Sequence, residues 1–321
     1  MRTRRRSLLA TSLMLHGPQT LSWSEDMLPL VGDNDVVVET IAGAISIGSE
    51  LPRYLGQSRE VKTLLYPMMT GYESYGHITG VGKGVSEQLI GEKIIAFYGH
   101  RTHAILPADT LIFTPSRIPP PTALLAILTC DVAKGIRKLN IKPEERVLVT
   151  GAGAIGLMTI WMLKRYGVNS IHVLEIDAER CEKALVLGAS SAVHPDEAIR
   201  WAEDFDIGIE CSNNDAGFQI LQEKLAHGSR ICILSDGNLA PLTLSSHFHH
   251  KELSVIASSD GWDYHRHAIW FWQQVKEANI LADTLFDMTI PHLELAQTFA
   301  TLAKGQVNPV KVLINYRNDW S

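Results

Sequence analysis

The sequence is poor in cysteine, and its cysteines do not cluster. It contains four in 321 residues, with no CxxC pair among them. This scarcity argues against a cysteine-rich zinc lobe or a disulfide framework, and scattered single cysteines are typical of a reducing compartment. We therefore expect a cytoplasmic protein. The four are Cys130, Cys181, Cys211 and Cys232.

Long apolar runs and an excess of positive charge are also missing. No run of 18 or more apolar residues occurs, so we expect no membrane-spanning helix. The formal net charge is −6, which gives no general attraction for nucleic acid or anionic membrane. The N-terminal run "RTRRR" is short, and the apolar residues after it are interrupted by Thr11 and Ser12. We predict neither a nucleic-acid arm nor an export signal.

Two patterns divide the chain. From about Ser12 to Ile118, short β-branched runs such as "DVVVETIAGAIS" are separated by Gly and Pro, which predicts a β-rich region. From Arg146, the apolar strands "RVLVT", "SIHVLEI", "DIGIECS" and "RICILSDG" alternate with helical segments, among them "DAGFQILQEKLAHG", which we predict to be helical throughout. Continuous apolar strands are typical of a parallel sheet covered on both faces. We therefore predict an α/β fold with a doubly wound parallel sheet.

The clearest motif is a GxGxxG pattern formed by Gly151, Gly153 and Gly156. It follows one strand, opens a helix and precedes a second strand that ends in Glu175, which is the context of a dinucleotide-binding site. Gly151 permits the tight turn, and Gly153 lets the backbone approach a pyrophosphate at the helix N-terminus. Gly156 allows the helix and strand to pack closely. The motif predicts a Rossmann-type site.

Glu175 indicates NAD rather than NADP. Its carboxylate can accept hydrogen bonds from both ribose hydroxyls, whereas a 2′-phosphate would meet a like charge. Arg180, five residues further on, leaves the choice open because it could turn toward a phosphate. The other residues expected to border the cofactor are Ala154, Ile155, Ser212, Leu234, Ser235 and Ser258.

Over nearly its whole length the chain resembles the medium-chain dehydrogenase/reductase superfamily, which is alcohol dehydrogenase-like. The similarity is carried by "GYESYGHITGVG", "RTHAILPADTLIFTPS", "LNIKPEERVLVTGAGAIG" and the closing "VKVLINY". It implies a GroES-like catalytic domain over residues 1–127, a Rossmann NAD-binding domain over 128–258 and a return to the catalytic domain over 259–321. It also implies a homodimer that acts on a small-molecule substrate.

The zinc enzymes of this superfamily hold their metal with a cysteine, the histidine of Gly-His-Glu and a further cysteine or acid. The matching positions here are Ile47, Tyr72 and Ala126. An aliphatic side chain, a phenol and a methyl group cannot form a tetrahedral zinc site, so the resemblance implies the zinc-free branch and no metal. The best rival cluster is the histidines of "SSHFHHKEL". We expect these on a strand of the cofactor domain, as surface or packing residues.

Without zinc, another group must stabilise the negative charge that develops on the substrate oxygen during hydride transfer. Tyr72 is the candidate because it takes the place of a metal ligand, and a phenol with a usual pKa of about 10 is a hydrogen-bond donor at neutral pH. Ser49 matches the hydroxyl that relays the proton in the zinc enzymes, although Pro52 lies where their outer relay histidine would be. Glu50 and Glu73 follow these residues and are candidates for orienting the site.

Each of these four residues also has a structural interpretation. Tyr72 could fill the space left by the metal, and Ser49 could cap a turn. Glu50 and Glu73 could be salt-bridge partners, for example of Arg53.

A narrower resemblance lies in the active-site segment. "SIGSE" followed by "YPMMTGYESYG" resembles the bacteriochlorophyllide hydroxyethyl-side-chain dehydrogenases. It implies a zinc-independent, NAD(H)-dependent oxidoreductase that interconverts a secondary alcohol and a ketone by hydride transfer, with a tetrapyrrole side chain as one candidate substrate. Two alternatives stay open: an NAD(P)H-dependent quinone or enoyl reductase, and a catalytically inactive cofactor-binding scaffold.

Overall fold

The computed structural model describes residues 8–57, 65–202, 204–236, 240–275 and 280–317. The chain divides into two compact units. The first comprises Met1–Leu124 and Phe286–Ser321, and the second comprises Leu125–Leu285. The N-terminal basic run lies outside the described residues. Among the residues that the structure describes, no helix is both long and apolar enough to cross a membrane.

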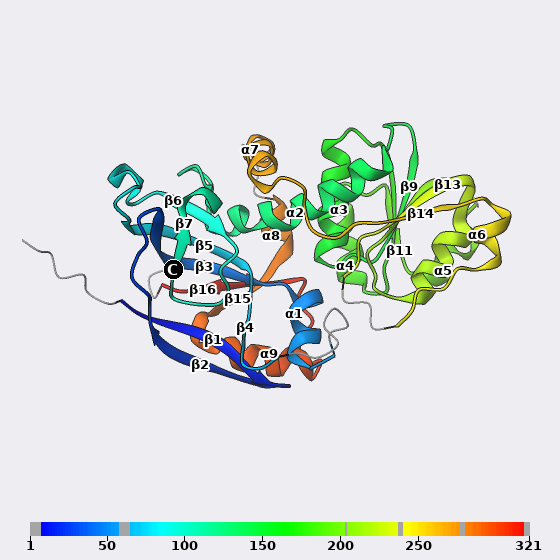
Figure 1. Ribbon diagram of the computed structural model, residues 1–321. Helices are drawn as coiled ribbons and strands as arrows, with labels where there is room; N and C mark the ends of the chain where they lie inside the picture. Colours follow the sequence, from blue (N-terminus) through cyan, green and yellow to red (C-terminus); the bar gives the residue numbers. More distant parts are fainter. Residues whose placement is uncertain (1–7, 58–64, 203, 237–239, 276–279, 318–321) are drawn as a thin grey trace, which may run out of the picture. The chain divides into compact units, whose positions relative to one another are not determined.

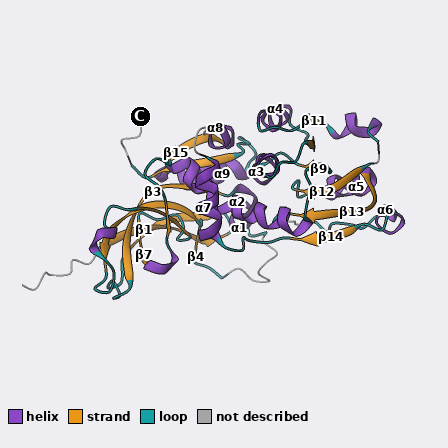
Figure 2. Ribbon diagram, turned by 90° about the horizontal axis from the view of Figure 1, so that it is seen from above, coloured by secondary structure: helices purple, strands orange, loops and turns teal. Residues whose placement is uncertain are grey.

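Strands dominate the first unit (Figures 1 and 2). One sheet has the order β15–β16–β3–β5–β6–β8, with β7 also paired to β3, and a smaller sheet has the order β2–β1–β4. The strands are β1 (Leu9–Gly17), β2 (Thr20–Met27), β3 (Asp35–Ile45), β4 (Met68–Met69), β5 (Glu73–Val81), β6 (Lys93–Ala96), β7 (His103–Pro107), β8 (Ile112–Phe113), β15 (Phe286–Pro291) and β16 (Lys311–Asn315). The helical segments are α1 (Ile47–Tyr54), η1 (Glu87–Leu89), η2 (Ala108–Thr110), η4 (His292–Glu294) and α9 (Leu295–Ala303).

The pairing of three strands brings distant segments of the first unit together. β3 runs antiparallel to β5, with Ala44 opposite Glu73, so α1, which follows β3, begins beside the residue before β5. β16 pairs antiparallel with the other edge of β3, with Val312 opposite Ile45. The start of α1, the start of β5 and the start of β16 therefore meet at one end of the sheet.

An apolar core lies under this end of the sheet. Phe299 of α9 is buried against Leu13 and Leu15 of β1, and Ile45 of β3 belongs to the same cluster. The ring of Tyr54, in the last turn of α1, lies with its centroid 5.5 Å from that of Phe299. Each such buried side chain stabilises the fold by about 1.5–3 kcal/mol relative to exposure. This packing fixes α1 against the sheet.

The second unit is a parallel sheet with helices beside it (Figure 1). The strand order is β11–β10–β9–β12–β13–β14, and every pair is parallel. This is a doubly wound sheet whose order reverses between β9 and β12, so the predicted α/β fold is confirmed. The strands are β9 (Arg146–Thr150), β10 (Ser170–Leu174), β11 (Ser191–Val193), β12 (Phe205–Glu210), β13 (Leu225–Ile233) and β14 (Ser254–Ala257). The helical segments are α2 (Pro120–Leu139), α3 (Ala154–Arg165), α4 (Ala178–Val186), η3 (Pro195–Arg200), α5 (Asp215–Lys224), α6 (Ser246–His250), α7 (Tyr264–Gln274) and α8 (Ile280–Leu285).

Two local predictions in the second unit were wrong. The histidine-rich "SSHFHHKEL" segment forms the short helix α6 instead of a strand, because the Phe248 amide bonds to the Ser245 carbonyl and Phe248 packs against the core below the sheet. The helix α5 ends at Lys224, and the following "LAHG" begins β13. Leu225 is fully buried in that strand, so tertiary packing decides its conformation.

Residues 259–285, which the sequence analysis assigns to the return segment, lie in the second unit here. Aromatic packing explains their position. The ring of Phe271 on α7 meets that of Trp161 on α3 edge-on, with centroids 5.6 Å apart. Thr129 Oγ1 and His267 Nε2, on α2 and α7, are 2.9 Å apart. The return to the first unit begins at Phe286.

Candidate active site

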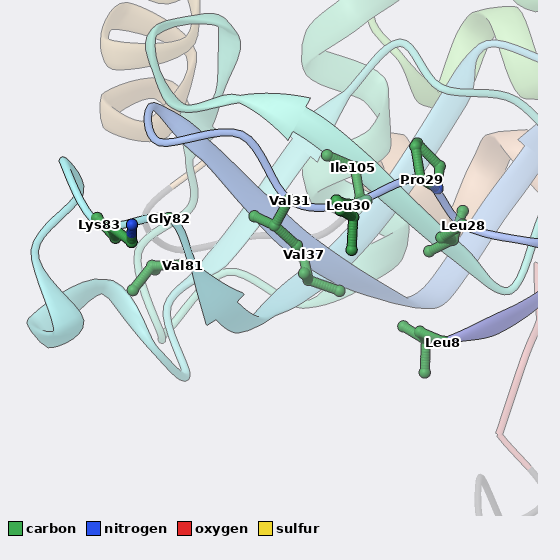
Figure 3. A pocket seen from close by; sticks show the side chains of 10 residues that line it. All are labelled: Leu8, Leu28, Pro29, Leu30, Val31, Val37, Val81, Gly82, Lys83 and Ile105. Carbon is green, nitrogen blue, oxygen red and sulfur yellow. The ribbon is translucent and has the colours of Figure 1, made fainter. Parts of the chain in front are cut away.

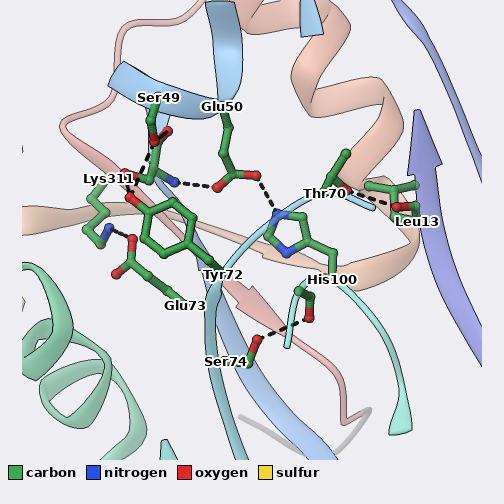
Figure 4. A network of polar contacts seen from close by, with 11 residues as sticks. Leu13, Ser49, Glu50, Thr70, Tyr72, Glu73, Ser74, His100 and Lys311 are labelled. Atoms are coloured by element: carbon green, nitrogen blue, oxygen red, sulfur yellow. Dashed lines mark hydrogen bonds and ion pairs between the residues drawn. The ribbon is translucent and has the colours of Figure 1, made fainter. Parts of the chain in front are cut away.

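Tyr72 lies in a group of hydroxyls just before β5 (Figure 4). Its Oη donates a hydrogen bond to Ser46 Oγ at 2.6 Å and lies 3.3 Å from Ser49 Oγ. Ser46 is the N-cap residue of α1, but its side chain makes no capping bond, so its oxygen can accept from Tyr72. Burial raises the pKa of Tyr72 well above its usual value, and the neighbouring Glu73 raises it further. The phenol is therefore protonated at neutral pH and can donate.

Glu50 is buried beside this hydroxyl group and uses both carboxylate oxygens. Oε1 accepts the backbone N–H of Ser46 at 2.8 Å. Oε2 lies 2.9 Å from Nε2 of His100, and the two side chains are 5% and 1% exposed (Figure 4). The Glu50 carboxylate thus joins the first turn of α1 to a histidine of the loop before β7.

Glu73 forms a second buried ion pair. Its Oε1 accepts from Lys311 Nζ at 2.6 Å, and neither side chain is more than 1% exposed. Within the described residues, the other carboxylate oxygen has no hydrogen-bond partner. Burial raises the pKa of the Glu73 carboxyl, and Lys311 only partly opposes this shift. The partner is therefore Lys311 of β16, in place of the Arg53 that the sequence suggested.

A small cavity of about 30 Å³ adjoins Glu50. Its polar wall is formed by Glu50, Arg53 and Thr70, beside Gly71. A water molecule needs roughly 10–15 Å³ of such space and two or more polar partners. The cavity therefore has room for a water molecule beside Glu50. The apolar wall is formed by Leu15, Leu21, Tyr54, Met68, Met69 and Phe299.

A larger cavity of about 220 Å³ in the first unit has different chemistry (Figure 3). Its side chains are apolar except for Lys83. None of the predicted catalytic residues contributes to it, so it adds nothing to the active site. It is lined by Leu8, Leu28, Pro29, Leu30, Val31, Val37, Val81, Gly82, Lys83 and Ile105.

The backbone around the GxGxxG motif has a tight turn at Gly151 and close helix–strand packing at Gly156. Gly151 has φ +83°, and a Cβ there would lie 2.7 Å from the Cα of Ser212. A Cβ on Gly156 would lie 1.9 Å from the Gly151 carbonyl oxygen. At Gly153 a Cβ would meet nothing within 4 Å, so the backbone there faces open space.

The helix that follows this loop has an uncapped N-terminus. α3 begins with Ala154 and Ile155, and its N-cap residue Gly153 has no side chain to bond the first N–H groups. Free N–H groups and the helix dipole favour an anion at this position. The loop and helix therefore fit the pyrophosphate of a dinucleotide.

Glu175 supports the same loop from the end of β10. Its Oε2 accepts the Ala152 N–H at 2.6 Å, and its Oε1 accepts the N–H groups of Ile176 at 2.8 Å and Asp177 at 3.0 Å. Arg180 lies in the first turn of α4, where its backbone N–H donates to the Asp177 carboxylate at 3.2 Å. Glu175 is therefore held beside the glycine loop by three backbone N–H groups.

Glu210 lies at the carboxyl end of the sheet and forms hydrogen bonds with three other predicted cofactor-binding residues: Ser212, Leu234 and Ser235. Its Oε1 accepts from the backbone N–H and the Oγ of Ser212 at 2.7 and 2.5 Å, and Ser235 Oγ donates to its Oε2. The N–H groups of Leu234 and Ser235 both donate to the Glu210 carbonyl at 3.0 Å. Ser258 follows the next strand, β14, and in the described part of the chain its buried Oγ has no partner.

Two sequence similarities to known proteins bear on this chain. Residues 154–268 match the family described as zinc-binding dehydrogenase. The L-threonine 3-dehydrogenase of Aeromonas salmonicida (strain A449) is 26% identical over 251 residues, which cover 66% of this chain and 73% of that enzyme. These similarities support an alcohol dehydrogenase-like, medium-chain dehydrogenase. The family match lies entirely within the second unit, so it does not include the positions of Ile47 and Tyr72.

Solved structures share the fold of this chain. The 2R,3R-butanediol dehydrogenase of Bacillus subtilis has a TM-score of 0.82 at 19% identity and covers 96% of this chain and 100% of that one. A zinc-binding dehydrogenase of Sinorhizobium meliloti 1021, bound to NADP, has a TM-score of 0.83 at 18% identity and covers 96% and 99%. At this level of identity the likeness concerns the fold alone.

At the positions of the family's zinc ligands, this chain has side chains that pack or bond to other groups. Ile47 packs against the apolar core of the first unit, and Ala126 is buried on α2. Tyr72 bonds to serines. Among the described residues, no group of three His, Cys, Asp or Glu side chains is placed to hold a metal ion. The histidines of α6 therefore do not form such a group either.

The sequence analysis missed four residues of the site: Ser46, His100, Glu210 and Lys311. A signal existed for two of them. Ser46 directly precedes "IGSE", and Glu210 is an acid at the carboxyl end of an apolar strand, where ligands bind in open α/β sheets. No local signal marked the other two. His100 is 50 residues from Glu50, and Lys311 is 238 residues from Glu73.

Proposed function

We propose that this dehydrogenase works without zinc and interconverts a secondary alcohol and a ketone with NAD(H). The observation that carries the proposal is the Tyr72 hydroxyl, which takes a metal ligand's place in the family pattern and lies between two serine hydroxyls. Ile47 and Ala126 offer no ligand atoms, and a neutral phenol is a poor ligand for zinc. These residues do not fit the metal.

The second unit fits the dinucleotide. Gly151–Gly156 would hold the pyrophosphate at the N-terminus of α3, and Glu175 would face the ribose. Ser212, Leu234 and Ser235 would border the rest of the cofactor at the carboxyl end of the sheet. NAD(H) supplies the hydride acceptor or donor of the reaction when it is bound.

Tyr72 is the group that meets the substrate oxygen in this proposal. In ketone reduction its Oη would redirect its hydrogen bond from Ser46 to the carbonyl oxygen and then give up its proton there. Ser46 and Ser49 are the nearest hydroxyls from which the proton could be replaced. Burial raises the pKa of Tyr72 most, and the charges of Glu73 and Glu50 raise it further. The phenol therefore stays protonated until it transfers its proton to the substrate oxygen.

Several finer features remain part of the proposal. The resemblance of "SIGSE" and "YPMMTGYESYG" to chlorin dehydrogenases supports a hydroxyethyl group on a tetrapyrrole as one substrate. Scattered free cysteines support a reducing, cytoplasmic location. A homodimer follows from the family resemblance.

The cofactor preference tests the role of Glu175. We expect catalytic efficiency with NAD(H) to exceed that with NADP(H) by at least about tenfold, because a 2′-phosphate would meet the Glu175 carboxylate. In Glu175→Gln the side chain keeps its size and loses its charge, so the difference in catalytic efficiency between NAD(H) and NADP(H) should become smaller. Steady-state kinetics with both cofactors measure this, and equal or better use of NADP(H) by the unaltered protein would refute the assignment.

The reaction type is tested by comparing two kinds of substrate. With NAD, we expect turnover of simple secondary alcohols such as 2-butanol and 1-phenylethanol. With NADH, reduction of the C=C bond of 2-cyclohexen-1-one should be at least about tenfold slower, because the proposed donor serves an oxygen atom. Faster enone reduction would favour a quinone or enoyl reductase. Binding of NADH without turnover of any substrate would favour a scaffold.

A further inference from the structure

His100 forms a buried pair with Glu50 but has no role in the reaction proposed above. The two side chains are almost fully enclosed, and Nε2 lies 2.9 Å from Oε2. Burying a carboxylate is unfavourable unless hydrogen bonds satisfy it. An apolar residue would fill this position of α1 without that penalty, so the pair needs an explanation beyond packing.

His100 is held tightly in place. Its backbone N–H donates to the Thr70 carbonyl at 2.8 Å, and its own carbonyl accepts the Leu13 N–H at 2.8 Å. Gly71 has φ +77°, and a Cβ there would lie 2.6 Å from the imidazole ring. The glycine directly before Tyr72 therefore makes room for this ring, and the chain on both sides fixes it.

A continuous path of hydrogen bonds leads from His100 to Tyr72. Glu50 Oε2 is hydrogen-bonded to His100 Nε2, and Glu50 Oε1 accepts the Ser46 N–H. Ser46 in turn accepts the Tyr72 hydroxyl at 2.6 Å. Ser46 makes no side-chain capping bond to α1. Its N–H donates to Glu50 and its hydroxyl oxygen accepts from Tyr72, while its carbonyl accepts a longer bond of 3.4 Å from Ser49 Oγ.

We propose that His100 is a positioning residue for the reaction at Tyr72. It holds Glu50, Glu50 holds Ser46, and Ser46 aims the Tyr72 hydroxyl. This inference rests on the proposed function, in which that hydroxyl serves the substrate oxygen. Outer groups that lock the rotamers of reacting groups are a general requirement of active sites, because small displacements weaken catalysis.

The test uses three variants of the full-length protein. His100→Leu removes the bond to Glu50, and we expect kcat to fall by about 10- to 100-fold, as for a displacement on the order of 1 Å. KM for NADH should change by less than about twofold, because His100 lies in the other unit from the glycine loop. His100→Gln, whose amide can donate to Glu50, should restore kcat to within about threefold of the unaltered protein.

A neighbouring histidine supplies the matched control. His103 is half-buried on β7, and its Nδ1 lies 3.2 Å from Thr102 Oγ1, away from the path to Tyr72. His103→Leu should therefore leave kcat within about twofold. A loss in His103→Leu as large as that in His100→Leu would contradict a specific role for His100.

A double-mutant cycle separates positioning from general support of the fold. In the Tyr72→Phe background, His100→Leu should change kcat by less than about twofold, because the hydroxyl that His100 positions is already gone. Equal effects of His100→Leu with and without the Tyr72 hydroxyl would overturn the inference. If His100→Leu does not fold, His100→Asn, whose shorter amide cannot reach Glu50, takes its place in the cycle.

The cycle also distinguishes this inference from the proposed function. If Tyr72→Phe alone leaves kcat unchanged, the proposed function fails and the inference fails with it. If Tyr72→Phe lowers kcat but neither His100→Leu nor His100→Asn does, only the role of His100 is refuted.

Discussion

Tyr72→Phe is expected to lower turnover by roughly 10²–10³-fold, the usual cost of losing an oxyanion donor. The substitution keeps the ring and its packing and removes only the Oη that lies between Ser46 and Ser49. NADH affinity should hardly change, because Tyr72 belongs to the first unit and Gly151–Glu175 to the second. The measurements are steady-state turnover, NADH binding and melting temperature.

Tyr54→Phe is the matched control for this loss. Tyr54 is a buried tyrosine of α1, and its hydroxyl makes a long bond of 3.5 Å to the Gln19 carbonyl. Its removal should leave turnover within about threefold. If Tyr72→Phe also stays within that range, Tyr72 only fills the site of the missing metal ligand. The donor would then be sought at Ser49.

Lys311→Met should reduce the free energy of unfolding by about 3–5 kcal/mol, because it leaves Glu73 buried without its counter-ion. Glu73 is fully buried, and its Oε1 bonds Lys311 at 2.6 Å. Lys304→Met, at an exposed lysine of the same unit, should change the free energy by less than about 0.5 kcal/mol. Denaturant unfolding measures both. If Lys311→Met loses no more free energy of unfolding than Lys304→Met, the Glu73–Lys311 ion pair does not stabilise the fold as proposed.

The same variant should show a defined pH dependence. Burial already raises the pKa of Glu73 in the folded protein above its usual value of 4.5, and removing Lys311 raises it further. A group with a raised pKa stabilises the fold below its unfolded-state pKa and loses this contribution as the pH rises through the folded-state value. The deficit of Lys311→Met should therefore shrink as the pH falls from neutral toward 4.5. A deficit independent of pH would mean that the charge of Glu73 is not its cause.

Much of the fold could be predicted because its signals are local. Continuous apolar runs mark the strands of the second unit, and Gly151 and Gly156 stand where the backbone is approached too closely for a Cβ. Prediction failed where packing decides between helix and strand. Leu225 continues a helical sequence but is buried in β13, and the histidine-rich segment forms a helix whose Phe248 packs on the core.

Only some residues of the candidate site could be predicted from the sequence, for a similar reason. Tyr72 and Ser49 stand in recognisable motifs, and their hydroxyls lie 3.3 Å apart. Their supporting groups are His100 and Lys311, which are distant in the sequence. The pairing of β16 with β3, and of β3 with β5, brings Lys311 to this end of the sheet, and the loop before β7 brings His100 there. Such partners follow from tertiary structure, which no local spacing reveals.

Turnover of a secondary alcohol by metal-stripped protein tests the central claim most directly. The protein is treated with a chelator, its zinc content is measured, and turnover with NAD is determined before and after one equivalent of zinc is added. If the Tyr72 hydroxyl does the work of the metal, stripped protein with far less than one zinc per chain should keep its turnover within about twofold, and added zinc should not raise it. Loss of turnover on chelation and its recovery with one equivalent of zinc would contradict the account.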